Sequence, residues 1–318
     1  MRYSARRRIG RIIFCLLALG ALGSLVILVR PVWVGEETAR LALWRQGIRS
    51  QSVVIDGNRI HYFEAVPSSP EQMKKAQTHD VPVLLIHGLG GRAEDWTAFL
   101  PALAAQGYHV YAPDLLGYGI SAQPKDATYS IVQEEDVIAK FMASRGIAQA
   151  DVAGWSMGGW ITMKLAMDHP GSVRRMVLID SAGIYFHPAM PLSLFAPETE
   201  DQLNELFHYL EPGDRTLPYF VRRDALRHLK ARAWVVNRSI NSMMSGLDLL
   251  DFRMSGLRQP VLIEWGAGDR LITADVGRRL HTLIPQSQYV EFPGCGHLVP
   301  VECSAEALPP LEDFFAAK

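Results

Sequence analysis

The chain has 318 residues, of which 48% are hydrophobic and 20% are charged, and its formal net charge is −1. This length suits one large α/β domain with a small addition better than two equal domains. The near-neutral charge gives no electrostatic basis for binding nucleic acid. Three cysteines are too few for a disulfide scaffold.

The N-terminus joins a basic segment to a long apolar one. Five arginines lie within the first 11 residues, and residues 12–29 then carry no charge. As a helix, this run would span about 27 Å, close to the ~30 Å hydrocarbon core of a bilayer. The main alternative is a cleaved signal peptide. Because the apolar run continues to Val29, beyond the small-residue cleavage sites, we favour a retained anchor.

The distribution of basic residues indicates how this anchor would be oriented. More arginines precede the apolar run than follow it closely, which favours a cytoplasmic N-terminus and a domain on the other side of the membrane. In a bacterium that side is the periplasm. We therefore assign residues 1–34 to the basic segment and anchor, and residues 35–50 to an amphipathic connector.

The next part of the chain alternates between strands and helices. Residues 51–66 are predicted to form two strands around the turn Asp56-Gly57-Asn58, and residues 67–80 to form a polar loop. A buried strand at 82–86 runs into His87-Gly88-Leu89-Gly90-Gly91. Further helices and strands follow as far as Asp180. This alternation predicts a mostly parallel sheet with right-handed crossovers.

A serine stands at the sharpest predicted turn of the chain. Residues 154–158 read Gly-Trp-Ser-Met-Gly, with an apolar strand before them and a helix after them. This pattern is typical of a nucleophile elbow, which exposes the hydroxyl of Ser156. The backbone N–H of Met157 is a candidate oxyanion donor. Leu89, in the glycine-rich loop after an earlier strand, is the candidate second donor.

Such a serine needs a histidine base and an acid that orients it. His297 lies in a glycine-rich loop after a late strand, and Asp269 follows the apolar strand at 261–266. The order Ser156, Asp269, His297 is the one expected of chains whose nucleophile lies in such an elbow. Asp180, at the end of its strand, is the rival acid. We interpret His87 as a positioning residue on the oxyanion loop.

Residues 184–259 interrupt the alternation and are predicted to form a helical cap. Four of them recur at helical spacing: Leu203, Leu206, Phe207 and Leu210. A second apolar cluster contains Met243, Met244, Leu247, Leu249 and Leu250. Either set could line a tunnel for an acyl chain. For each residue we slightly favour the simpler alternative, packing of the cap against the sheet.

Together these motifs resemble those of α/β-hydrolase-fold serine hydrolases over residues 50–318, and most closely those of the membrane-anchored monoacylglycerol lipases. The motifs are the oxyanion loop, Asp114-Leu-Leu-Gly-Tyr-Gly119, the serine elbow, Trp265-Gly-Ala-Gly-Asp269 and Gly294-Cys-Gly-His297. The resemblance implies an eight-stranded, mostly parallel sheet flanked by helices. Its core would comprise residues 51–183 and 260–318, with the cap inserted late in the sheet.

The same resemblance implies hydrolysis of a small-molecule ester, with lipid esters favoured by the predicted anchor. No metal or organic cofactor is expected. Two alternatives share the fold: a carbon–carbon bond hydrolase or perhydrolase, and a non-catalytic binding protein. The sequence indicates no oligomeric state. We predict that Cys295 and Cys303 are free thiols, although a bridge between them would fit an oxidising compartment.

Overall fold

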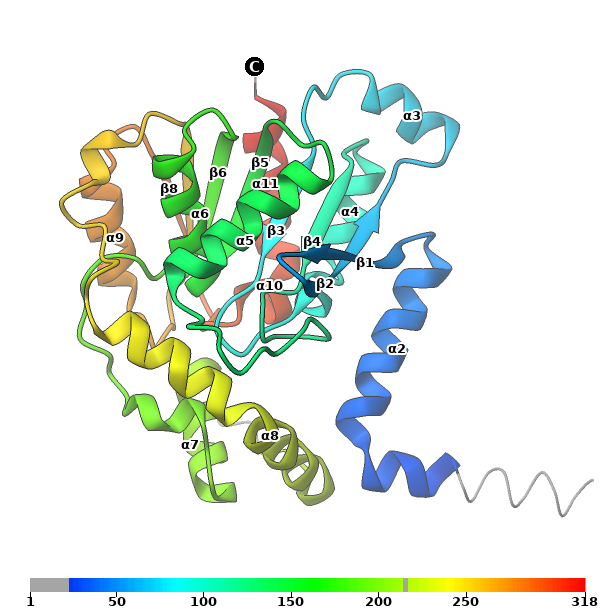
Figure 1. Ribbon diagram of the computed structural model, residues 1–318, viewed down its shortest axis with the longest axis vertical. Coiled ribbons are helices and arrows are strands. Elements are labelled where there is room, and N and C mark those ends of the chain that lie inside the picture. Colours follow the sequence, from blue (N-terminus) through cyan, green and yellow to red (C-terminus); the bar gives the residue numbers. More distant parts are fainter. Residues whose placement is uncertain (1–22, 214–216, 318) are drawn as a thin grey trace, which may run out of the picture.

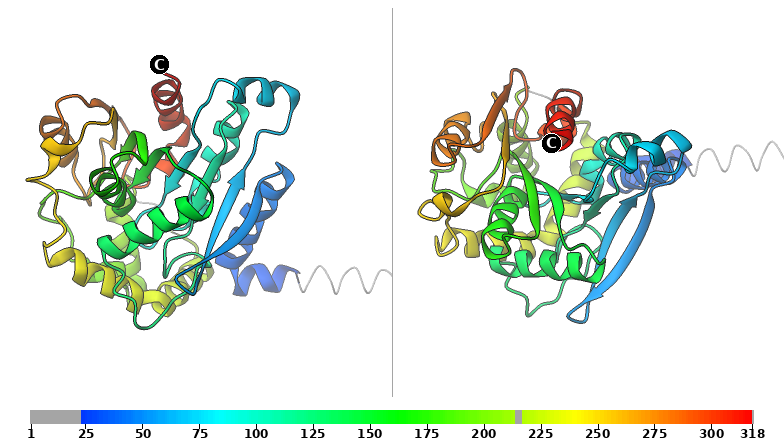
Figure 2. Two further views of the ribbon diagram at one scale, coloured as in Figure 1. Left: turned by 45° about the horizontal axis from the view of Figure 1, so that its top comes forward. Right: turned by 90° about the horizontal axis from the view of Figure 1, so that it is seen from above.

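A computed structural model describes residues 23–213 and 217–317. Eight strands form one sheet in the order β1-β2-β4-β3-β5-β6-β7-β8. Strands β1 and β2 form an antiparallel hairpin at one edge, β2 also runs antiparallel to β4, and all later neighbours are parallel (Figure 2). The strands are β1 (Arg49–Ile55), β2 (Asn58–Ala65), β3 (Val83–Ile86), β4 (Val110–Pro113), β5 (Ala150–Trp155), β6 (Val173–Ile179), β7 (Val261–Gly266) and β8 (Gln288–Phe292).

Helices cover both faces of this sheet (Figure 1). Helices α5, α6 and α9 pack on one face, and α4 and α11 pack on the other. The described helices and 3₁₀ turns are α2 (Pro31–Arg45), α3 (Pro70–Ala76), η1 (Ala93–Trp96), α4 (Phe99–Ala105), α5 (Ile131–Ser144), α6 (Met157–Asp168), η2 (Leu192–Phe195), α7 (Glu200–Leu210), α8 (Tyr219–Met244), η3 (Met254–Gly256), α9 (Ala274–Leu283), α10 (Val299–Glu302) and α11 (Ser304–Ala316).

The central strands are buried on both faces, as the helical layers require. Every residue of β3, β5 and β7 is buried. Their carboxyl ends lie at the same edge of the sheet, because these strands are parallel. The loops that follow β3, β5, β6 and β7 therefore meet at this edge, where ligand sites of open α/β sheets form.

The segment between β6 and β7, which we call the cap (residues 184–259), contributes no strand in its described part. It forms η2, α7, α8 and η3, and α7 and α8 lie together below the sheet in Figure 1. Helix α7 begins with a capping box, in which Thr199 accepts a hydrogen bond from the Gln202 N–H.

One local prediction differs from the structure. Residues 67–80 were expected to be a loop, but Pro70–Ala76 form α3. A Ser69–Gln72 capping box and a proline at the first helical turn explain this short helix. Most residues of this helix are polar or small, so the segment lacks the apolar periodicity that reveals longer helices.

The connector forms α2 and packs on the domain. Leu43 is fully buried in the core beneath it, and Arg40 contacts Glu94 at 2.7 Å. The predicted anchor falls largely on residues 1–22, outside the described residues. Within the described ranges, no helix is both long enough and apolar enough to cross a bilayer.

Glu134 in α5 supports the loop after β4 from within the core. One carboxylate oxygen accepts a hydrogen bond from the Leu116 N–H at 3.0 Å, and the other has no partner in the described chain. Burial raises the pKa of Glu134 from its ordinary 4.5 to about 8. Because the folded protein binds this proton more tightly than the unfolded chain, Glu134 contributes fully to the free energy of unfolding below pH 4.5. This contribution is lost as the pH rises through about 8.

We expect Glu134→Gln to raise the melting temperature by a few degrees at pH 9, because glutamine stays neutral and keeps an oxygen for Leu116. At pH 5 the two proteins should melt at nearly the same temperature. Thermal unfolding followed by circular dichroism at both pH values measures this difference. A variant that melts below the wild type at pH 9 contradicts the argument.

Candidate active site

Ser156 occupies the turn between β5 and α6 in a backbone conformation that residues other than glycine rarely adopt, with φ at 54°. Two glycines make this turn sterically feasible. A Cβ atom on Gly154 would collide with the Gly158 carbonyl, and one on Gly158 would collide with the Ile86 carbonyl of β3. The strain is thus maintained by close packing between β5, α6 and β3.

His297 bridges Ser156 and Asp269. The Ser156 hydroxyl donates to His297 Nε2 at 3.0 Å, and His297 Nδ1–H donates to Asp269 Oδ2 at 2.7 Å. Exposed fractions are 9% for Ser156, 3% for His297 and 4% for Asp269, so little water competes for these bonds. The structure therefore brings together the three residues selected from the sequence, in the connectivity of an acid–base–nucleophile relay.

The loop carrying His297 is held on both sides. Trp155, the residue before the serine, donates its indole N–H to the His297 carbonyl at 2.7 Å. The His297 N–H donates to the carbonyl of Leu210, the last residue of cap helix α7. Arg270, which follows Asp269, donates to the Pro212 carbonyl at 3.0 Å. The cap thus fixes the loops of both the base and the acid, which the sequence did not reveal.

Cys295 and Cys303 form a disulfide, so the prediction of two free thiols is wrong. The bond closes a short loop that contains His297 and joins it to the N-terminal end of α11. The sequence showed two cysteines near the histidine but could not show that their side chains face each other. The disulfide restricts the backbone that carries the base.

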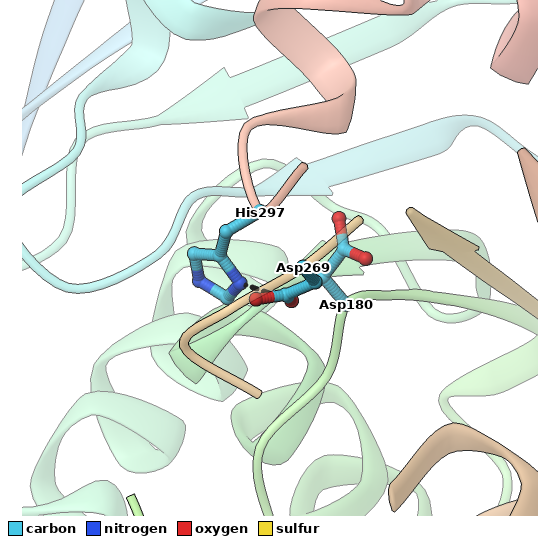
Figure 3. Close-up of side chains that lie close together, drawn as sticks. All are labelled: Asp180, Asp269 and His297. Atoms are coloured by element: carbon cyan, nitrogen blue, oxygen red, sulfur yellow. Dashed lines mark hydrogen bonds and ion pairs between the residues drawn. The ribbon is translucent and has the colours of Figure 1, made fainter. Parts of the chain in front are cut away.

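Asp180 and Asp269 are both buried next to His297 (Figure 3). Asp269 makes the bond to the imidazole, and its other oxygen accepts from the Leu271 and Ile272 amides. Asp180 instead accepts from the Gly266 N–H at 2.8 Å, and its second oxygen has no partner in the described residues. Burial and the Asp269 charge raise the pKa of Asp180 well above its usual range. Its surroundings therefore favour the protonated form of Asp180.

Ligand atoms of Asp180, Asp269 and His297 all lie within 4.8 Å of one another, close enough for a metal site. However, a metal bound to His297 Nδ1 would replace the proton that joins this nitrogen to Asp269. The hydrogen bonds observed here use the same atoms for the acid–histidine pair. We therefore interpret the cluster as the acid–histidine pair of a catalytic triad, in which Asp269 orients the base.

The loop after β3 passes directly beside the serine. A Cβ atom on Gly88 would lie 3.0 Å from the Ser156 Cβ. Neither the Leu89 N–H nor the Met157 N–H donates a hydrogen bond to the described residues. These are the two amides selected as oxyanion donors, and Met157 begins α6, where the helix dipole adds positive potential.

His87 holds this loop in place. Its Nδ1–H donates to the Gly88 carbonyl at 2.8 Å, and its Nε2 accepts from the Leu115 N–H at 3.0 Å. Burial lowers the pKa of His87, which favours the neutral ring that these two bonds require. Because both ring nitrogens are occupied, His87 joins two loops and carries no proton to the substrate.

A cavity of about 190 Å³ opens beside Ser156, and its lining is almost entirely apolar. Leu89 and Met157 are among the residues that line it. Of the two apolar sets singled out in the cap, the second contributes Met243, Met244 and Leu249 to the wall. The four residues of α7 do not line this cavity; Leu203 and Leu206 are buried, and Leu206 packs in the core on that face of the sheet.

The chain belongs to the alpha/beta hydrolase family, whose model matches residues 83–308. Together with the site geometry, its relatives identify it as a serine hydrolase. It is 28% identical over 254 residues to Lipase 1 of Psychrobacter immobilis, covering 75% of this chain and 79% of the lipase. It is also 30% identical over 257 residues to the 2-hydroxymuconate semialdehyde hydrolase of Pseudomonas putida, covering 76% and 89% of the two chains.

Among solved structures, the chain is similar to one described as a membrane phospholipase A. The two share 25% sequence identity with a TM-score of 0.77, over 96% of this chain and 97% of the other. The likeness therefore extends beyond the residues of the family model toward both ends of the chain.

Exchange of the two aspartates for asparagine should have unequal effects. Asp269→Asn removes the charge that orients His297, and we expect labelling of Ser156 by a fluorophosphonate to slow by orders of magnitude. Asp180→Asn places an uncharged group of the same size where burial already disfavours a charge, and should change the rate by less than about threefold. Labelling rates on the two folded variants measure this. If Asp180→Asn is the variant in which labelling of Ser156 slows by orders of magnitude, Asp180 and not Asp269 orients the base.

Removal of the disulfide should loosen the His297 loop. We expect the double variant Cys295→Ser/Cys303→Ser to lose about 2–3 kcal/mol of unfolding free energy, because a short closed loop is released. Denaturant unfolding with and without reductant provides the measurement. The reductant should destabilise the wild type and leave the double variant unchanged; equal stability of both proteins would show that the bond restricts little.

Proposed function

We propose that this enzyme hydrolyses carboxylic esters with apolar acyl chains through an acyl-enzyme on Ser156. The observation that carries the proposal is the hydrogen-bonded series Ser156–His297–Asp269 opening onto an apolar cavity. A nucleophile at the mouth of such a cavity suits a substrate whose reactive carbonyl bears a hydrocarbon chain.

In the proposed mechanism, His297 accepts the Ser156 proton while the serine oxygen attacks the ester carbonyl. Asp269 keeps the imidazole in the tautomer that accepts at Nε2 and stabilises the imidazolium. The Leu89 and Met157 amides donate to the developing oxyanion. His297 then protonates the departing alcohol, and water attacks the acyl-enzyme by the same route.

A lipid ester is the substrate class that we favour. The methionines and aliphatic side chains of the cavity can adapt to a flexible chain. Relatives named as lipases support this preference. Within this class, the earlier resemblance to monoacylglycerol lipases makes a single-chain glycerol ester the first substrate to test.

We further propose that residues 12–29 anchor the enzyme in a membrane, with the hydrolase domain on the side away from the cytoplasm. The uncharged run and its arginine flank support the anchor, as does the likeness to a membrane phospholipase A over most of the chain. The Cys295–Cys303 disulfide supports an oxidising compartment.

A second candidate function is hydrolysis of a carbon–carbon bond in a ring-fission product. The 30% identity to a 2-hydroxymuconate semialdehyde hydrolase supports it, and the serine relay would serve either reaction. Product analysis separates the candidates, because an ester yields an alcohol and an acid.

The deciding experiment uses purified enzyme and p-nitrophenyl esters of increasing acyl length. We expect turnover that prefers medium or long chains and is lost at least about a thousandfold in Ser156→Ala, because the substitution removes the hydroxyl that His297 activates. Fluorophosphonate labelling of the same proteins is the control. Unchanged turnover in Ser156→Ala contradicts the mechanism.

The remaining outcomes distinguish the alternatives. Labelling of Ser156 without turnover of any ester, but with cleavage of a 2-hydroxy-6-oxo dienoate, selects carbon–carbon chemistry. A wild-type protein that is neither labelled nor active would be a binding protein with the fold of an enzyme.

A further inference from the structure

A second cavity lies on the other side of the oxyanion loop from the apolar one. Its volume is about 320 Å³. Gly90 lines it, whereas the preceding Leu89 lines the apolar cavity. Helix α8 contributes to both walls at successive turns, with Val236 in the second cavity and Ile240 in the first. The proposed oxyanion donor thus lies between two mainly apolar cavities, of which the second also contains basic side chains.

The second cavity contains two guanidinium groups. Arg92 is neutralised by an ion pair with Glu36 of α2, and His228 also lies 3.5 Å from that carboxylate. Arg232 of α8, which is half-buried, has no carboxylate partner in the described part of the chain. Its observed hydrogen bond goes to the Gly119 carbonyl at 2.6 Å.

The charge on Arg232 is only partly compensated by its surroundings. Burial and the nearby charge of Arg92 lower the pKa of the Arg232 guanidinium. The carboxylates of Glu36, Asp114 and Glu94 offset only part of this effect on the pKa. It nevertheless stays protonated at neutral pH, since guanidinium groups titrate far above that range. A bound anion would offset this unfavourable positive charge and accept hydrogen bonds from the remaining N–H groups.

We propose that this cavity binds the alcohol portion of the substrate and that Arg232 recognises an anionic group on it, a phosphate or a carboxylate. The proposal rests on the proposed ester hydrolysis and specifies its substrate: the acyl chain occupies the apolar cavity, the carbonyl lies at Ser156, and the charged alcohol extends toward Arg232. The enzyme would then prefer anionic lipid esters over neutral ones.

The position of α2 supports this arrangement. Val32, in the first turn of α2, lines the second cavity, and its N–H donates to the buried Asp224 of α8 at 3.0 Å. The cavity therefore lies next to the point where the chain leaves the proposed anchor. A lipid headgroup at the membrane surface would meet this side of the enzyme first.

Three octanoyl esters test the proposal: those of glycerol 3-phosphate, glycerate and glycerol. They share an acyl chain and a three-carbon alcohol but differ in charge. We expect Arg232→Gln to lower kcat/KM for the anionic esters about tenfold, mainly through KM, because a charge-assisted hydrogen bond is lost. Activity on the glycerol ester should change less than about twofold, since glutamine can still donate to Gly119.

Arg238→Gln is the matched control. Arg238 lies on the same helix and donates to the Lys125 and Ala127 carbonyls, outside the cavity. This variant should treat all three esters as the wild type does. A preference for the phosphate ester over the glycerate ester identifies phosphate as the recognised group, and the reverse identifies carboxylate.

An equal loss on all three esters in Arg232→Gln, or a wild type that does not distinguish charged from neutral esters, overturns the proposal. A separate measurement tests the subsite without requiring that the enzyme hydrolyse any ester. Glycerol 3-phosphate and glycerate should slow fluorophosphonate labelling of Ser156 in the wild type and not in Arg232→Gln. Protection by neither anion would reject the subsite even if the enzyme cleaves no ester.

Discussion

The backbone turn at Ser156 is the constraint on which the site depends. A positive φ at a serine is unfavourable and persists only where the surrounding packing imposes it. Here β3, β5 and α6 approach so closely that side chains at Gly154 and Gly158 would clash with neighbouring backbone. The same close approach brings the loop after β3 beside the serine. The same packing therefore positions both the nucleophile and the oxyanion loop beside it.

The base and acid depend on a different part of the molecule. His297 and Asp269 follow separate strands, and the cap fixes both of their loops through backbone carbonyls at the end of α7. The disulfide adds a covalent restraint on the histidine side. A cap that covers the site can thus also organise it. Movement of the end of α7 would therefore alter the alignment of His297 and Asp269 with Ser156.

The oxyanion loop has an equally central place in substrate recognition. His87 fixes it from within, and Arg92 ties its far end to Glu36 of α2. An apolar cavity lies on one side and a cavity lined by Arg232 on the other. This arrangement would place the apolar acyl chain of the substrate in one cavity and its charged group in the other. The substrate carbonyl would lie at the boundary, where the amides point.

Local motifs were sufficient to determine the family and to select Ser156, Asp269 and His297, because parallel strands deliver their carboxyl-terminal loops to one edge of the sheet. They could not determine contacts between loops that are distant in the chain. The Cys295–Cys303 bond, the raised pKa of Asp180 beside Asp269, and Arg232 in a second cavity all depend on such contacts. A side chain's charge state and partners are set by burial and by neighbours from other elements, and these exist only once the chain has folded.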